Sequence, residues 1–124
     1  MILGFKKQFV SKILRGEKIH TIREDPNDRW KPDREIHFAT GVRTKNYEQF
    51  HHGYCYSVER IEIRYDNKSF VPEIYIEKEL LSCMEDHLDL ARNDGFEGLQ
   101  DFYNWFDKPF KGKIIHWTDL KYIL

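Results

Sequence analysis

The sequence predicts an α+β fold, a small and partly closed β-barrel of about six strands with two or three helices. Two observations predict this class. Several short segments alternate between apolar and polar residues, and helical periodicity is confined to a few connections between them. A chain of 124 residues is long enough to bury one core, so residues 1–124 are expected to form a single domain.

The first predicted element is a short helix that ends near Gly16. Phe9, Ile13 and Leu14 recur at the spacing that gives a helix one apolar face. Glycine tolerates the positive φ that commonly follows the last helical residue. We therefore expect the helix to stop at Gly16 and the chain to turn there.

Residues 19–23 are expected to run as a strand directly after this turn. Alternation along a strand places Thr21 and Arg23 on one face and buries Ile22 on the other. Lys18 lies in the turn itself, and its flexible stem can reach the face that carries Thr21. An amine, a hydroxyl and a guanidinium can therefore converge here, and an ordinary exposed strand edge is the alternative.

The rest of the chain continues the same mixture of strands and helices. The patterns predict a loop at 26–32, strands at 35–42, 54–65, 70–76 and 113–117, a polar turn at 43–46, and helices at 77–91 and 99–106. Within the strand at 54–65 the apolar residues change phase, which predicts a β-bulge near Glu59 and Arg60. Asp94 falls in a turn just before the last helix.

Composition and charge exclude several classes of protein. Hydrophobic residues at 40% and aromatic residues at 15% exclude an ordinary disordered chain. A formal net charge of −1 excludes bulk attraction to nucleic acid, so any anionic partner must be held by a local cluster of cations. No apolar run reaches membrane-spanning length and no secretory signal is evident, so a cytoplasmic protein without a membrane partner is expected.

The two cysteines and the paired histidines carry weak indications of chemistry. Cys55 and Cys83 stand far apart, outside any Cys-x-x-Cys pair, and are expected to be buried thiols. His51 and His52 have no acidic residue or cysteine at ligand spacing, so a solvated loop is favoured over a metal site. We expect neither a metal nor another cofactor.

Four further residues are candidates for binding a substrate or nucleic acid. Trp30, between two loop prolines, is either a core anchor or a stacking surface. Arg43 and Lys45 place two cations on one turn, where they can contact phosphates of single-stranded RNA or simply face solvent. His116, in the last strand, either lines a cleft or packs in the core.

Residues spread over most of the chain resemble one known family. They are Phe9, Ile13, Leu14, Gly16, Lys18, Thr21, Ile22, Arg23, Trp30, Pro32, Asp94, Gly95, Phe96, Phe102 and Trp105. The pattern Gly-x-Lys-x-x-Thr-Ile-Arg, with an Asp-Gly-Phe turn before an aromatic helix, resembles the ASCH domain of the PUA-like superfamily. This resemblance implies a PUA-like β-barrel with a cleft between barrel and helices, in a superfamily associated with RNA and modified nucleobases.

Within that family, the chain is similar to the small bacterial amidohydrolases that deacetylate N(4)-acetylcytidine. Their catalytic set is a lysine, a threonine and a glutamate. The resemblance implies the same roles for Lys18 and Thr21, and it aligns the glutamate with Asp94, whose side chain is one methylene shorter. Arg23 can act as a second cation near the lysine or as a phosphate ligand.

Two classes of function therefore follow from the sequence. The first is an amidohydrolase with an acylated cytidine or a related modified nucleoside as substrate. Hydrolysis of such an amide needs a nucleophile, a proton acceptor and stabilisation of an oxyanion, which Thr21, Lys18 and Asp94 could divide between them. The second is an RNA-binding module, with or without ribonuclease activity. The near-neutral net charge favours the enzyme with a small substrate.

Overall fold

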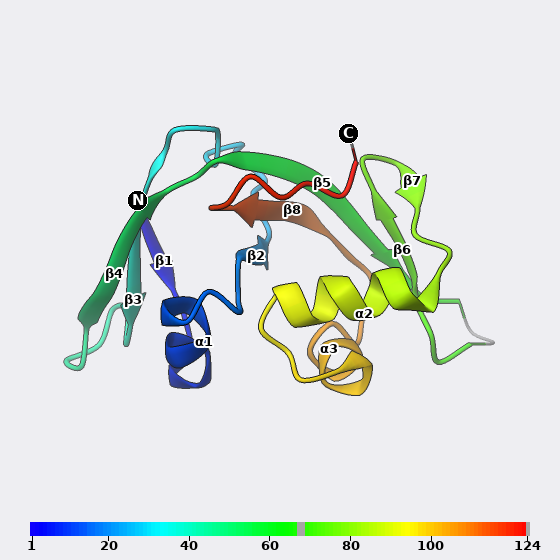
Figure 1. The fold of residues 1–124 in the computed structure, drawn as a ribbon, viewed down its shortest axis with the longest axis horizontal. Helices are drawn as coiled ribbons and strands as arrows, with labels where there is room; N and C mark the ends of the chain where they lie inside the picture. The colour runs from blue at the N-terminus through cyan, green and yellow to red at the C-terminus, as the bar shows by residue number, and fades with distance from the viewer. Residues whose placement is uncertain (67–68, 124) are drawn as a thin grey trace.

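The computed structural model describes residues 1–66 and 69–123 and has an α+β fold (Figure 1). In chain order its elements are β1 (Ile2–Gly4), η1 (Lys7–Phe9), α1 (Val10–Leu14), β2 (His20–Arg23), β3 (Glu35–Thr40), β4 (Glu48–Tyr54), β5 (Ser57–Arg64), β6 (Glu73–Ile76), β7 (Glu79–Leu80), α2 (Met84–Asn93), α3 (Leu99–Trp105) and β8 (Phe110–His116). The predicted α+β class is confirmed. The strands of the described residues form two sheets and no closed barrel.

One sheet has three strands in the order β1-β3-β4, and the other has five in the order β2-β8-β5-β6-β7. Strands β1 and β3 are parallel, whereas the other neighbouring strands run antiparallel. Figure 1 shows the three helices on the concave side of these curved sheets.

The chain passes from the first sheet to the second at Cys55 and Tyr56. The amide of Cys55 donates to the carbonyl of Arg34 at 2.7 Å, beside β3. The next amide, that of Tyr56, donates to the carbonyl of His116 at 2.7 Å, at the end of β8. Because these successive amides donate hydrogen bonds to different sheets, this dipeptide forms the corner between the two sheets.

The β-bulge expected near Glu59 and Arg60 is absent. Strand β5 pairs with β8 in an unbroken register from Ser57 to Ile63. The change of apolar phase has another cause, because Ser57 and Glu59 are polar yet buried on the same face as Ile61 and Ile63. Among the described residues, the register shifts instead between β3 and β4: Phe38 pairs with His51 and Ala39 with Gln49, so Phe50 of β4 is the extra residue.

Two other element predictions were wrong. The helix expected at 77–91 begins only at Met84, because Glu77 and Lys78 take positive φ values of 50° and 68° in the turn of the β6–β7 hairpin. The histidines placed in a loop, His51 and His52, lie instead on β4. The polar turn expected at 43–46 is present between β3 and β4.

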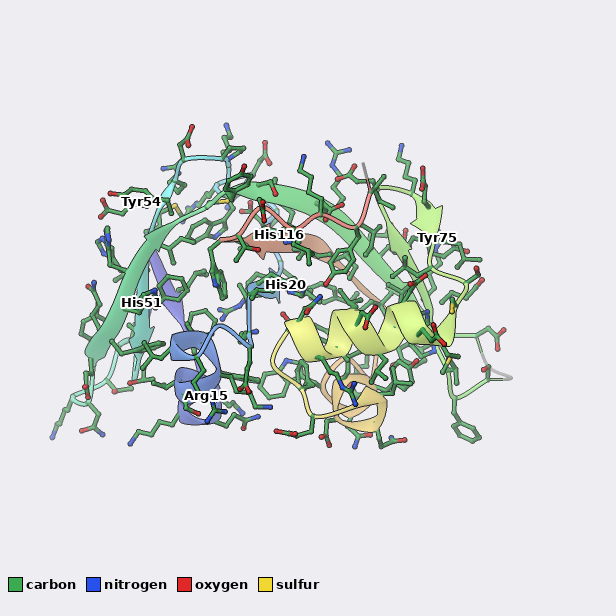
Figure 2. The ribbon with its side chains drawn as sticks, viewed as in Figure 1. Arg15, His20, His51, Tyr54, Tyr75 and His116 are labelled. Atoms are coloured by element: carbon green, nitrogen blue, oxygen red, sulfur yellow. The ribbon has the colours of Figure 1, made fainter. Side chains whose placement is uncertain are left out.

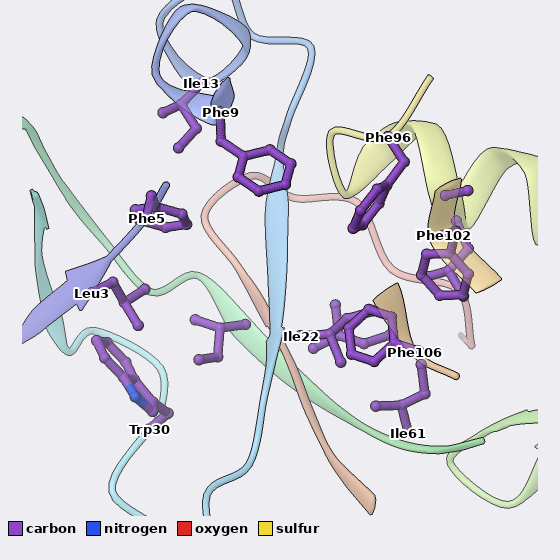
Figure 3. Packing of buried hydrophobic residues seen from close by; sticks show 14 of the residues in the cluster. Leu3, Phe5, Phe9, Ile13, Ile22, Trp30, Ile61, Phe96, Phe102 and Phe106 are labelled. Atoms are coloured by element: carbon purple, nitrogen blue, oxygen red, sulfur yellow. The ribbon is translucent and has the colours of Figure 1, made fainter. Parts of the chain in front are cut away.

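The core lies between the helices and the concave side of the sheets. Figure 3 shows Phe9, Ile22, Trp30 and Phe102 among its buried side chains. Cys55 is buried as expected, but Cys83 is exposed, just before α2. In the part of the chain that is described, no helix combines the length and apolarity needed to cross a membrane.

Candidate functional site

Lys18 is positioned by the turn that ends α1. Gly16 has a φ of 75°, and its amide bonds back to the carbonyl of Ile13 at 3.1 Å, while the amide of Glu17 bonds to that of Lys12 at 2.8 Å. These two bonds form a Schellman motif, which satisfies the free carbonyls of a helix end. The amide of Lys18 donates to the same Lys12 carbonyl at 3.0 Å, so the lysine backbone is fixed as the chain leaves the helix.

Asp94 is positioned by an equivalent turn at the end of α2. Gly95 has a φ of 95°, and its amide donates to the carbonyl of Arg92 at 2.9 Å, while the amide of Phe96 donates to that of Ala91 at 3.0 Å. A side chain at Gly95 would place its Cβ 2.9 Å from Cδ of Lys18, so glycine is required there for contact as well as for φ. Two helix ends thus bring Lys18 and Asp94 together.

The contact between Lys18 and Asp94 is a buried ion pair. Lys18 Nζ donates to the main-chain oxygen of Asp94 at 2.5 Å and to its carboxylate Oδ1 at 3.2 Å. Lys18 is 2% exposed and Asp94 is 3% exposed. The ammonium also lies 4.9 Å from the ring centroid of Phe9. A charge so enclosed is costly unless paired, which explains why carboxylate, carbonyl and ring surround it.

The surroundings of Lys18 lower the pKa of its amine below the ordinary value. Burial is the main cause, and the positive charge of Arg23 acts in the same direction, while the carboxylate of Asp94 opposes both. Burial outweighs the carboxylate, because little of the ammonium is exposed to solvent. A lysine amine in this setting can act as a proton acceptor more readily than an exposed one.

Thr21 and Arg23 extend the polar site along β2. Arg23 Nε donates to Thr21 Oγ1 at 3.0 Å, and Arg23 Nη2 donates to the main-chain oxygen of Gly4 at 2.6 Å. The guanidinium also stacks near Phe5, 4.9 Å from the ring centroid. Ile22 between them is buried, as the strand alternation predicts. Because Arg23 occupies an acceptor position on Thr21, the hydroxyl proton is free to point toward another group.

These residues open onto one cleft of about 440 Å³, within the range of pockets that bind small molecules. Its polar lining comes from Lys6, Lys18, Thr21, Arg23 and Asp94. Its apolar lining is largely aromatic and comes from Phe5, Phe9, Phe96, Trp105 and Phe106. The cleft therefore pairs a compact polar end with flat apolar walls.

Trp105 stands at the open side of this cleft. Its side chain is 44% exposed, although edge-to-face contacts at 5.6 Å hold it against Phe9 and Phe96. Lys6 Nζ lies 5.0 Å from the centroid of its ring. A rigid, accessible indole beside a cation is suited to stack on a planar ring.

Behind the ion pair, a chain of hydrogen bonds runs into the protein. Asn93 Nδ2 donates to the hydroxyl of Tyr122 at 3.0 Å, and that hydroxyl lies 2.6 Å from Nε2 of His20. His20 Nδ1 lies 3.1 Å from the carboxylate oxygen of Asp94 that also receives Lys18. A carboxylate can only accept, so we assign the His20 proton to Nδ1, and Tyr122 then donates to Nε2.

The pKa values in this chain agree with that assignment. Burial lowers the pKa of His20, although its hydrogen bond to Asp94 opposes the change, so the neutral ring is favoured. Burial also raises the pKa of Tyr122, which keeps its hydroxyl protonated. Asp94 is thus held on one side by an amine and on the other by a neutral imidazole that donates to it.

His116 belongs to a neighbouring buried cluster with Glu59. Its ring is fully buried and lies 5.2 Å from that of His20, and Figure 2 labels both histidines. Nε2 of His116 donates to Glu59 Oε1 at 2.7 Å. Glu59 also accepts from the amides of Tyr122 at 2.9 Å and Ile123 at 2.9 Å. Burial opposes ionisation of Glu59, but these three hydrogen bonds outweigh it and lower its pKa.

The eight residues singled out in the sequence therefore fall into two groups. Lys18, Thr21, Arg23 and Asp94 meet at the cleft. The other four are Trp30, Arg43, Lys45 and His116. Of these, Trp30 and His116 are buried away from solvent, and Arg43 and Lys45 are exposed on the turn between β3 and β4. Gly41 and Val42 of the same turn line the cleft, whereas Arg43 and Lys45 are not among its lining residues.

Sequence reasoning missed three residues of the site: His20, Trp105 and Tyr122. His20 precedes Thr21 on β2, so strand alternation places it on the face opposite the predicted site residues. Its Nδ1 contacts the carboxylate of Asp94, which lies at the end of α2, and not the residues on the cleft face of the strand. A buried histidine in a short strand next to a buried lysine is the sequence feature that could have indicated it.

In comparisons with known proteins, no protein-family model, no curated protein and no solved structure matches this chain.

Proposed function

We propose that this protein is an amidohydrolase of the ASCH type, which removes an acyl group from the exocyclic amine of cytidine or a related modified nucleoside. The observation that supports it best is the buried amine of Lys18, held 3.2 Å from the Asp94 carboxylate at the floor of a cleft that Thr21 also lines. An amine, a hydroxyl and a carboxylate in one aromatic cleft suit the hydrolysis of an amide on a flat base.

Each residue has a distinct role in the proposed reaction. Neutral Lys18 accepts a proton from the attacking group, which is either the Thr21 hydroxyl or a water that Thr21 orients, and returns it to the exocyclic nitrogen as the C–N bond breaks and the nucleoside leaves. Where Thr21 attacks, water then hydrolyses the acyl-threonine ester and releases the acid. Arg23, 3.0 Å from Thr21 Oγ1, supplies positive charge where the tetrahedral oxyanion develops. Asp94 orients the lysine amine, and Trp105 offers a stacking surface for the base.

We also propose that the two sheets correspond to a PUA-like β-barrel that is open along one side. The corner at Cys55 and Tyr56 supports this, because hydrogen bonds run from this dipeptide to both sheets. The resulting surface curves around the helices, and the cleft lies between the helices and the sheets, as the ASCH resemblance implies.

An RNA-binding module, with or without ribonuclease activity, is the second candidate. It is favoured by one observation: the exposed cations Arg43 and Lys45 come directly after Gly41 and Val42, which line the cleft. Phosphates on either side of a bound base could contact them. For this candidate, neutralising both cations should weaken binding of a short single-stranded RNA and reduce its salt dependence.

The test of the enzyme is turnover of N(4)-acetylcytidine by the purified protein, followed as release of cytidine. We expect hydrolysis by the parent, and loss of turnover with substrate binding largely kept in Lys18→Arg, because arginine keeps the charge but cannot become neutral. A Lys18→Arg variant that hydrolyses the substrate at nearly the parental rate would show that Lys18 is not the general base.

A matched control distinguishes catalysis from a general effect of losing a lysine. Lys7→Arg changes an exposed lysine of η1 that is not part of the cleft lining and should leave turnover unchanged. If the parent shows no hydrolysis but shifts a short single-stranded RNA, and Arg43→Gln with Lys45→Gln abolishes that shift, the RNA-binding candidate replaces the enzyme.

A further inference from the structure

Outside the cleft, strands β3 and β4 bring three potential metal ligands to one point on the surface. His37 and His52 are directly opposite each other in the antiparallel register. Glu35 precedes His37 by two residues on β3, so alternation places its side chain on the same face. One ligand atom from each of the three residues lies within 4.8 Å of the other two.

The separation between His52 and Glu35 matches that of two atoms that share a small metal ion, whereas His37 contacts Glu35 directly. His52 Nε2 lies 3.5 Å from Glu35 Oε1, and His37 Nε2 contacts the same carboxylate oxygen. Two ligands at about 2.1 Å from a tetrahedral zinc ion lie about 3.4 Å apart. Both imidazoles therefore already direct Nε2 toward one place, and only small side-chain rotations separate this arrangement from coordination.

The backbone and neighbouring rings hold these side chains in position. The amide of His37 donates to the carbonyl of Met1 at 2.8 Å, which fixes β3 beside β1. The ring of His52 packs edge-on against Tyr54 at 5.3 Å. Solvent can still reach the site, because the side chains of Glu35, His37 and His52 are 47%, 34% and 44% exposed.

We propose that Glu35, His37 and His52 form a binding site for a divalent transition-metal ion of the Zn²⁺ class. Two imidazoles and one carboxylate suit zinc, copper, nickel or iron rather than Mg²⁺ or Ca²⁺, which take mainly oxygen ligands. Three protein ligands leave a coordination position for water or for a group on another molecule. The site is independent of the cleft and of the proposed hydrolysis.

Zinc binding to the tag-free protein tests this site, measured by calorimetry and, with Co²⁺ as a probe, by visible absorption. We expect one ion per chain, d–d bands for Co²⁺ that indicate nitrogen and oxygen ligands, and no competition from an equal concentration of Mg²⁺. His52→Ala and Glu35→Gln should each weaken zinc binding by at least about tenfold.

His51→Ala is the matched control, since it removes the adjacent exposed histidine, whose ring lies 5.0 Å from that of Phe38 instead. It should bind zinc as the parent does. Equal losses in His51→Ala and His52→Ala would show an adventitious surface ion and overturn the proposal, as would undiminished binding in His52→Ala. Circular dichroism of each variant verifies that a loss of binding does not reflect unfolding.

Discussion

At the scale of single residues, the state of Lys18 depends on neighbouring charges with opposite effects. Burial sets the overall direction of the lysine pKa downward, Asp94 raises the pKa, and Arg23 and Lys12 lower it. The carboxylate is needed to hold the amine in place, yet it works against the neutral form that a general base requires. Arg23 lowers the pKa of Lys18 and so partly offsets the effect of Asp94. Its position beside Thr21 therefore affects the lysine amine as well as the threonine hydroxyl.

This balance predicts opposite pKa changes in two variants. Asp94→Asn keeps a hydrogen-bond acceptor near Nζ but removes the negative charge, so the pKa of Lys18 should fall further. Arg23→Gln removes a cation, so the pKa should rise. NMR titration measures the pKa of Lys18 in both variants. The ¹³Cε signal of Lys18 is identified as the lysine signal that disappears in Lys18→Met. Changes of the same sign in the two variants would contradict the balance.

The same pKa sets the direction of the pH dependence of the proposed reaction. A base must be neutral, so the rate should rise with pH until the lowered pKa of Lys18 is passed. The midpoint of this rise should move with the NMR-measured pKa in Arg23→Gln. A midpoint that stays fixed while the NMR value moves would assign the titration to another group.

At the scale of elements, the site depends on two helix ends, and their glycines make it testable. Gly16 and Gly95 both have positive φ, but only Gly95 is crowded, with Lys18 Cδ and Phe9 Cδ1 each 2.9 Å from an added Cβ. Gly98 has an extended backbone and open space around it. Alanine substitutions at these three glycines therefore distinguish the cost of backbone strain from the cost of steric contact.

We expect Gly16→Ala to lower the free energy of unfolding by about 1–2 kcal/mol through left-handed strain alone. Gly95→Ala should cost at least about 1 kcal/mol more, because Lys18 and Phe9 must move. Gly98→Ala should change stability by less than about 0.5 kcal/mol. Chemical denaturation measures all three, and an equal cost at Gly16 and Gly95 would show that the contact with Lys18 does not constrain the turn.

Sequence patterns predicted elements well where one face is apolar and failed where polar residues are buried. The helix end at Gly16 and the burial of Ile22 followed from local rules alone. The bulge predicted in β5 was wrong because Ser57 and Glu59 are on its core face. Glu59 is bound there by His116 and the C-terminal segment, which come from distant parts of the chain. Local periodicity carries no information about such partners.

At the scale of the whole molecule, the features that sequence patterns did not predict are those that depend on contacts between distant segments of the chain. The cluster of Glu35, His37 and His52 requires the register of β3 with β4, which no local pattern specifies. The convergence of Lys18 and Asp94, separated by 76 positions, was available only through the ASCH resemblance. The contact of His20 with Asp94 and Tyr122 likewise joins three separate segments.

This network also links the stability of the fold to pH through His20. Burial lowers the pKa of its ring in the folded protein, whereas the unfolded chain titrates near 6.5. Below that value the unfolded state binds a proton that the folded state refuses, so stability is full above about pH 6.5 and is lost as pH falls toward the folded pKa. Glu59, whose pKa is also lowered, loses its contribution only in a more acidic range.

We therefore expect His20 to account for part of the stability lost between pH 7.0 and 5.5. In His20→Gln, whose amide can donate to Asp94 and accept from Tyr122, the free energy of unfolding should depend less on pH over that interval. Urea denaturation at both pH values measures the difference, with His20→Asn as a second variant. His51→Gln, at an exposed position, should keep the parental dependence. A parental dependence in both His20 variants would mean that the folded ring accepts its proton, and the donor role assigned to Tyr122 would then be wrong.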